Sequence, residues 1–172
     1  MKKLTGIALI VVVLLSGTSV FAQELESVSA TASTTAVIAS PLSIEKIEDL
    51  NFGILLSLGS AKAIVNQEGT IGGDATWGNI ANVKSAKFNI VGDPGSTVFI
   101  TLPNESYKVT NVSDSNYDMV VDDLISYPQE QITLDSTSGE KTIEVGATLH
   151  INKDQKSGIY TNGSDLLVAV SY

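Results

Sequence analysis

The sequence predicts an all-β protein, with an immunoglobulin-like antiparallel β-sandwich of about eight to ten strands. Many short segments alternate apolar and polar residues with the period of two that a half-buried strand requires. Turn residues separate these segments at short intervals, and no long helical period follows the N-terminal segment. Together these patterns exclude a helical or α/β architecture.

The N-terminal segment has the features of an export signal. Lys2 and Lys3 form a positive start, residues 4–15 are apolar, and Ala22 ends a small-residue cleavage pattern. We therefore expect residues 1–22 to be removed and the mature chain to begin at Gln23. The apolar run is too short to span a bilayer, so no membrane span is expected after cleavage. The predicted location is the periplasm, the cell surface or the extracellular medium.

The composition limits the possible functions of the mature chain. Residues 23–172 contain no linker and are predicted to form a single domain. The whole chain has 19 acidic and 10 basic residues, and two basic residues lie in the signal, so the mature net charge is about −11. Such a surface repels nucleic acid, which is therefore not an expected partner. Since the chain has no cysteine, disulfides and thiol chemistry are excluded.

The first predicted strand is the run from Val28 to Ile38, which alternates small apolar residues with serine and threonine. At ~3.3 Å per residue it would extend for about 36 Å, the length of a sandwich edge. It either forms the first strand of its own sheet or inserts into a neighbouring subunit. In the second case the inserted side chains are Val28, Ala30, Ala32, Ala36 and Ile38.

Further strands follow in order along the chain. Gly53 is expected at a bend, and residues 69–78 are expected to form a loop. Residues 86–90 and 98–102 alternate on either side of the turn at 93–96 and are interpreted as a hairpin. The remaining predicted elements are a strand at Tyr107–Val109, a strand or a short helical turn at Asp118–Ile125, a strand at Gln131–Leu134, and the clearest strand, Lys141–Ile151.

The last predicted strand, Leu166–Tyr172, is apolar on both faces. Asn162 and Gly163 favour the positive φ angles of a tight hairpin, which would pair this strand with the segment around Tyr160. An exposed edge strand is not usually apolar on both faces, so its free side is expected to be covered. The candidate cover is the 28–38 segment of this molecule or of the next. The predicted assembly residues on the strand are Leu166, Val168, Val170 and Tyr172.

Residues with catalytic or metal-binding chemistry are few. His150 is the one histidine, predicted to face solvent with no nucleophile beside it, so neither a catalytic residue nor a cofactor is expected. Residues 114–125 have the first spacings of an EF-hand but lack its glycine and final glutamate. Weak calcium binding by Asp118, Asp122 and Asp123 is an alternative, although no metal site is predicted. Two further options are open. One is acid–base glycoside hydrolysis by carboxyl groups among Glu45, Glu48 and Asp49. The other is stacking of a sugar ring on Trp77 and Tyr117.

Five short motifs occur in a fixed order along the chain. They are Leu50–Gly53, Thr101–Pro103, Val145–Leu149, Gly158–Tyr160 and Val168–Tyr172. This ordered set resembles a family of secreted bacterial domains of unknown function, and the resemblance runs from about Val28 to Tyr172. A more distant resemblance is to the spore coat protein U domain and the archaic chaperone–usher pilins. It implies an incomplete sandwich filled by a strand of the next subunit.

The function expected from these observations is non-enzymatic. The chain is interpreted as a structural or adhesive subunit of a surface appendage or extracellular assembly, held together by β-strand complementation. Its expected partners are copies of itself or related subunits, and a periplasmic chaperone. The alternative is a monomeric secreted module that binds carbohydrate or another ligand through the loop at residues 69–79 and exposed aromatic side chains.

Overall fold

A computed structural model describes residues 28–163 and 166–172. The chain divides into two units, residues 1–36 and residues 37–172. The predicted export signal lies outside the described residues. Residues 28–36, in the first unit, form no strand and have exposed side chains, so the alternative in which 28–38 is the first strand of its own sheet is wrong. The physical reason is that a strand needs a hydrogen-bonded neighbour, and no described residue pairs with this segment.

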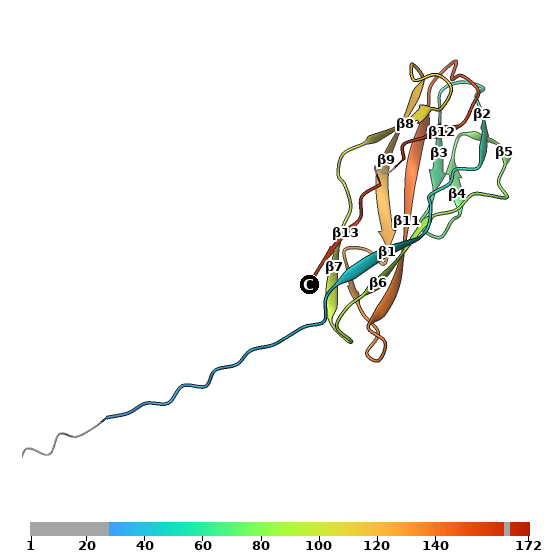
Figure 1. The fold of residues 1–172 in the computed structure, drawn as a ribbon. Coiled ribbons are helices and arrows are strands. Elements are labelled where there is room, and N and C mark those ends of the chain that lie inside the picture. The colour runs from blue at the N-terminus through green and yellow to red at the C-terminus, as the bar shows by residue number, and fades with distance from the viewer. Residues whose placement is uncertain (1–27, 164–165) are drawn as a thin grey trace, which may run out of the picture. The chain divides into compact units, whose positions relative to one another are not determined.

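The described part of the second unit contains thirteen strands, joined by turns and short loops (Figure 1). No described helix could span a membrane. The strands are β1 (Ser43–Glu48), β2 (Ile54–Leu56), β3 (Ala61–Val65), β4 (Ile71–Gly73), β5 (Thr76–Asn79), β6 (Ala86–Val91), β7 (Thr97–Thr101), β8 (Tyr107–Asn111), β9 (Asp118–Tyr127), β10 (Gln131–Thr133), β11 (Glu140–Ile151), β12 (Tyr160–Thr161) and β13 (Ala169–Ser171).

The main sheet is built around β11, the longest described strand. Its order is β1-β6-β11-β9-β8-β12, and β3 and β4 extend it beside the second half of β11. Along one edge, β11 pairs with β6 up to Val145 and with β3 from Ala147 onward. Gly146 therefore lies where the neighbour of β11 changes. Because β6 and β3 follow each other along the same edge, one long strand positions two halves of the sheet.

Two smaller sheets complete the second unit. One has the order β10-β7-β13, and the other consists of β2 and β5. All the pairings between the described strands are antiparallel, which confirms the predicted all-β class and its sandwich-like layering. The described strands outnumber the eight to ten expected because several are two- or three-residue pieces.

Apolar side chains from these sheets form two core clusters. Phe88, Ile90, Val98, Ile132 and Ile143 belong to the first, which lies between the main sheet and the β10-β7-β13 sheet. The alternation predicted for residues 143–151 is confirmed. The second cluster lies toward the β2–β5 end of the unit and consists of Ala63, Ala75, Met119, Val121, Ala147, Leu149 and Ile151.

Both predicted hairpins are wrong. The turn at residues 93–96 forms, with a hydrogen bond of 3.1 Å from Ser96 N to Asp93 O, but it joins β6 to β7 in different sheets. Similarly, β12 pairs with β8, whereas β13 pairs with β7. The reason for the first change of sheet is burial, because β6 and β7 both direct alternate apolar side chains into the first cluster. Strands paired in one sheet could not face each other across that core.

The region predicted to be a loop, residues 69–78, also differs from expectation. It contains β4 and most of β5, and β4 pairs with β3 in the main sheet. Gly73 has a φ of +85°, and a Cβ there would lie 2.1 Å from Lys62 O, so the backbones approach closely. The glycines that indicated a loop are used instead for a tight connection between two strands. Asp118–Ile125, for which the sequence allows a strand or a short helical turn, lies within β9.

Candidate assembly groove

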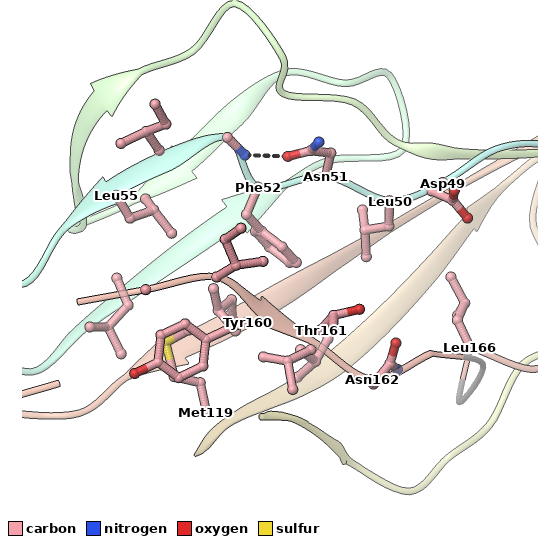
Figure 2. Close-up of a pocket in the computed structure, with 18 of the residues that line it drawn as sticks. Asp49, Leu50, Asn51, Phe52, Leu55, Met119, Tyr160, Thr161, Asn162 and Leu166 are labelled. Carbon is pink, nitrogen blue, oxygen red and sulfur yellow. Dashed lines mark hydrogen bonds between the residues drawn. The ribbon is translucent and has the colours of Figure 1, made fainter. Parts of the chain in front are cut away.

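A cleft of about 1140 Å³ lies in the described second unit. One wall is the segment 49–57, which leads from β1 into β2, and the other consists of residues 155–163, which include β12, and of Leu166. Figure 2 shows Leu50 and Phe52 on the first wall directed toward Thr161 and Leu166 on the second. The cleft therefore lies between the connection from β1 to β2 and the residues around β12. We call it the groove.

The floor of the groove is part of the protein core. Four strands of the main sheet contribute it, and its side chains belong to the two core clusters or pack against them. These floor residues have less than a tenth of their surface exposed, except Tyr107 and Val109, which are half-buried. The groove thus reaches down to core side chains instead of to a polar pocket. Its floor consists of Ala86, Phe88, Tyr107, Val109, Met119, Val121, Leu149 and Ile151.

The first wall is fixed by a bend at Gly53. Asn51 forms a backbone bridge to Lys84, and its side-chain Oδ1 accepts a hydrogen bond of 2.7 Å from Gly53 N. Gly53 has a φ of +67°, and a Cβ there would lie 2.7 Å from Asn79 O. The predicted bend is therefore confirmed, because this conformation and this close approach both require glycine. Beyond it, β2 pairs on one side with β5.

The second wall is held by hydrogen bonds to the β8–β9 turn. Val112 N donates to Ile159 O at 2.9 Å, and Lys156 Nζ lies 2.7 Å from Asp114 Oδ2. Gln155 Nε2 donates to Asp118 O at 3.2 Å and to Tyr160 Oη at 2.9 Å. The wall is consequently a constrained segment with a defined position in this unit.

The ion pair between Asp114 and Lys156 makes this wall sensitive to acid. Hydrogen bonds from Lys156 and Asn116 lower the pKa of Asp114 below its ordinary value of 3.8, and Asp114 raises the pKa of Lys156 above 10.5. A depressed carboxyl pKa stabilises the fold at neutral pH, and this contribution is lost as the pH falls below 3.8. The lysine contribution persists below pH 10.5 and is lost above it.

We expect acidification from pH 5 to pH 2 to increase hydrogen exchange at residues 155–160 in the wild type, because this interval lies across and below 3.8. Asp114→Asn keeps an oxygen acceptor but cannot titrate, so its exchange there should change less over the same interval. Exchange mass spectrometry at the two pH values, corrected for the intrinsic rate, measures the difference. Asp74→Asn, which changes a carboxylate outside this wall, is the control. Equal responses in wild type and Asp114→Asn would contradict this assignment.

The rim of the groove combines exposed apolar side chains with paired charges. Ile54 and Ile159 are 57% and 74% exposed, and both line the cleft. At the other end, Lys46 pairs with Asp49, and Glu48 pairs with Lys84. Because these charges are already matched, the rim has no strong charge preference of its own. An apolar, uncharged segment fits such a groove better than a charged ligand does.

The predicted assembly residues lie in different places. Leu166 lines the groove, whereas Val168 and Val170 pack on the first core cluster beside β7. Leu167, on the opposite face of the last strand, is 70% exposed, and the 28–38 segment of the same molecule does not cover it. Tyr172 lies away from the groove and is hydrogen-bonded near the start of β1. The remaining predicted residues, Val28, Ala30, Ala32, Ala36 and Ile38, are exposed.

Sequence reasoning did not find the groove floor. The alternation in β6 and β11 correctly identifies the inward faces, but it does not show which part of an inward face has an open cleft above it. That depends on the paths of residues 49–57 and 155–163, which leave their sheets at positions set by tertiary contacts. The one local signal was Gly53, which marks the bend of the first wall.

The other candidate residues have structural partners. His150 Nε2 lies 2.7 Å from Asp122 Oδ1 on the outer face of the main sheet and is half-buried, where full exposure was expected. Trp77 packs against the second core cluster, and Lys156 Nζ lies 5.4 Å from the ring centroid of Tyr117. Glu48 and Asp49 are in the rim ion pairs. In the described ranges, no three acidic or histidine side chains are arranged to hold a metal ion.

Comparison with known families identifies the chain. It belongs to the family described as a domain of unknown function, DUF4402, whose model matches residues 42–172. The match begins at Leu42, whereas we expected the resemblance to begin at Val28. No curated protein and no solved structure matches the chain. Residues 28–41 therefore precede the family domain.

Proposed function

We propose that this member of the DUF4402 family is an exported, non-enzymatic structural subunit that assembles through β-strand complementation. In this proposal, residues 28–38 of one copy, here called the arm, lie in the groove of a second copy. The observation that carries the proposal is the groove itself, which reaches core side chains between the connection from β1 to β2 and the residues around β12. A strand is the element that would complete such a gap.

The walls of the groove offer hydrogen-bonding edges to an added strand. Among the described strands, β12 ends the main sheet, and β2 pairs on one side with β5. Unpaired strand edges are templates for pairing with another chain. An inserted arm would gain backbone hydrogen bonds along a wall and would cover the exposed rim residues Ile54 and Ile159.

The arm has the properties that this groove requires. It has no charged side chain, and its small apolar residues alternate with serine and threonine. Val28 and Ile38, at its two ends, are 91% and 96% exposed and gain the most from burial. The volume of the groove, about 1140 Å³, exceeds the range of about 300–1,000 Å³ typical of small-ligand pockets. A peptide segment therefore fits the groove better than a small molecule does.

The wider setting of the assembly is proposed from sequence patterns alone, namely the predicted export signal and the distant motif resemblance to the spore coat protein U domain and the archaic chaperone–usher pilins. We propose that the assembly is a surface appendage or extracellular layer, and that a periplasmic chaperone occupies the groove before assembly. The negative charge of the chain is compatible with a soluble subunit that crosses the cell envelope before it assembles.

The proposal is tested with the mature chain, residues 23–172, a version beginning at Ala39, and a synthetic peptide of residues 28–38. We expect the mature chain to form oligomers of increasing size and the shortened chain to be a monomer. The peptide should bind the shortened chain and raise its melting temperature, because a ligand that binds only the folded state stabilises it. Light scattering after gel filtration and thermal unfolding measure these outcomes.

A peptide of the same composition in scrambled order is the matched control, since it lacks the alternation. Ala86→Trp, which places a bulky side chain on the groove floor, should abolish binding of the native peptide. The proposal is wrong if the mature chain is a stable monomer and the native peptide binds no better than the scrambled one.

A further inference from the structure

The hydroxyl of Tyr172 connects three segments that are distant in the sequence. It accepts a hydrogen bond of 2.8 Å from Asp93 N and donates one of 2.7 Å to Ser40 O. Ser40 Oγ also donates to Asp93 Oδ1 at 3.3 Å. Residue 40 lies just after the arm, Asp93 lies in the β6–β7 turn, and Tyr172 follows β13. We call this arrangement the root clamp.

Gly92 leaves space for the hydroxyl of Tyr172. A Cβ on Gly92 would lie 2.7 Å from Tyr172 Oη and 2.9 Å from Leu42 Cδ1. Gly92 N also donates to Gly139 O at 2.9 Å, which fixes the backbone beneath the tyrosine. The absence of a side chain at residue 92 therefore leaves room for the hydroxyl between two backbone segments.

The root clamp and the groove lie at opposite ends of β1 and β6. Ser43 pairs with Val91, and Glu48 pairs with Lys87, so β1 runs from the clamp end toward the groove end. Figure 1 shows the chain end after β13 beside β1 and β7, with β2, β5 and β12 at the far end of the unit. Ser40 precedes the groove residue Asp49 by nine positions, or ~30 Å of extended chain at ~3.3 Å per residue.

We propose that the root clamp makes the arm select the groove of a second copy over the groove of its own chain. This inference rests on the proposed function. To enter its own groove, the arm would have to reverse direction next to Ser40 and run back along β1. The clamp holds Ser40 at the end of β1 opposite the groove, so the return path of ~30 Å would use most of the ~36 Å that eleven extended residues span.

Closure therefore either leaves few arm residues to fill the groove or requires the hydrogen bonds of Tyr172 to break, and both raise the free energy of the closed monomer. Insertion into a second copy leaves the clamp intact. Because the root and the groove occupy opposite ends of one domain, the contact between copies is head to tail. Such a contact propagates as an open chain of subunits.

The test replaces Tyr172 by phenylalanine in the mature chain, residues 23–172. This removes the hydroxyl and keeps the ring, so the two hydrogen bonds are lost together. Their loss should raise the ratio of closed monomer to oligomer by roughly tenfold or more. Ser40→Ala, which removes only the bond from Ser40 Oγ to Asp93, should shift the ratio less in the same direction. Tyr127→Phe, at an exposed tyrosine, is the control.

Native mass spectrometry measures the ratio, and closed monomers are recognised because added arm peptide does not bind them. Urea unfolding shows whether each variant is folded. If Tyr172→Phe oligomerises like the wild type while the peptide still binds the chain that begins at Ala39, the clamp inference is overturned and the groove proposal stands. If the peptide fails to bind that chain, the proposed function itself fails.

Discussion

Replacing Gly146 by alanine is expected to destabilise the protein by about 3 kcal/mol or more, at the upper end of the cost of overpacking. A Cβ at this position would lie 2.3 Å from Val65 O, 2.5 Å from Asn66 C and 2.6 Å from Gln67 N. All three atoms are backbone, so no side-chain rotation can relieve the contact. Gly146 lies where β11 changes its neighbour from β6 to β3, and a shift there disturbs both halves of the main sheet.

Urea unfolding of the chain that begins at Ala39 measures this effect without interference from assembly. The matched control is Gly72→Ala in β4, where the new Cβ would be 3.6 Å from Ile64 Cβ, an ordinary contact. We expect the control to change the free energy of unfolding by less than about 1 kcal/mol. Similar midpoints for the two variants would show that the backbone at residues 65–67 can move aside without loss, contrary to the close approach described above.

Replacing Ile143 by alanine is expected to lower the free energy of unfolding by about 2–5 kcal/mol. Ile143 is fully buried in β11 and belongs to the first core cluster. Its removal leaves a cavity between the main sheet and the β10-β7-β13 sheet, because both sheets are held at fixed spacing by the surrounding side chains. The loss combines the missing transfer free energy with the cost of that cavity.

Ile125→Ala is the control for this second prediction, since Ile125 lies on the neighbouring strand β9 and is 37% exposed. We expect it to cost less than half as much, because water fills the space that it vacates. Urea midpoints of both variants, compared at an unchanged slope, give the difference. A larger loss from Ile125→Ala than from Ile143→Ala would mean that the two faces of the main sheet have been assigned in the wrong sense.

The sequence predicted the parts of the fold that depend on local patterns. The alternation from Ile143 to Ile151 identified both the longest strand and its buried face, and Gly53 marked a bend that the structure confirms with a positive φ. These predictions succeed because side-chain periodicity and glycine conformations are properties of a few neighbouring residues.

Strand pairing was predicted less well. The turns around Pro94 and Gly163 suggested hairpins, yet each connects two different sheets. A turn sequence specifies a change of direction, but it does not specify whether the next strand pairs beside the previous one or crosses the core. That choice depends on which arrangement buries the apolar faces of both strands, and it involves partners as distant as β1, β11 and β13. For the same reason the groove, which depends on where two wall segments leave their sheets, was not predicted.

By itself, the sequence determined the all-β class, the buried face of β11 and the uncharged, alternating arm, because each follows from a pattern among neighbouring residues. The tertiary structure alone decided that residues 28–36 form no strand in the isolated chain, that a cleft lies between residues 49–57 and the residues around β12, and that Tyr172 binds Ser40 and Asp93. These features join residues up to 132 positions apart. The free energies of these contacts depend on which surfaces pack together in the folded chain, and a local sequence pattern does not specify that packing.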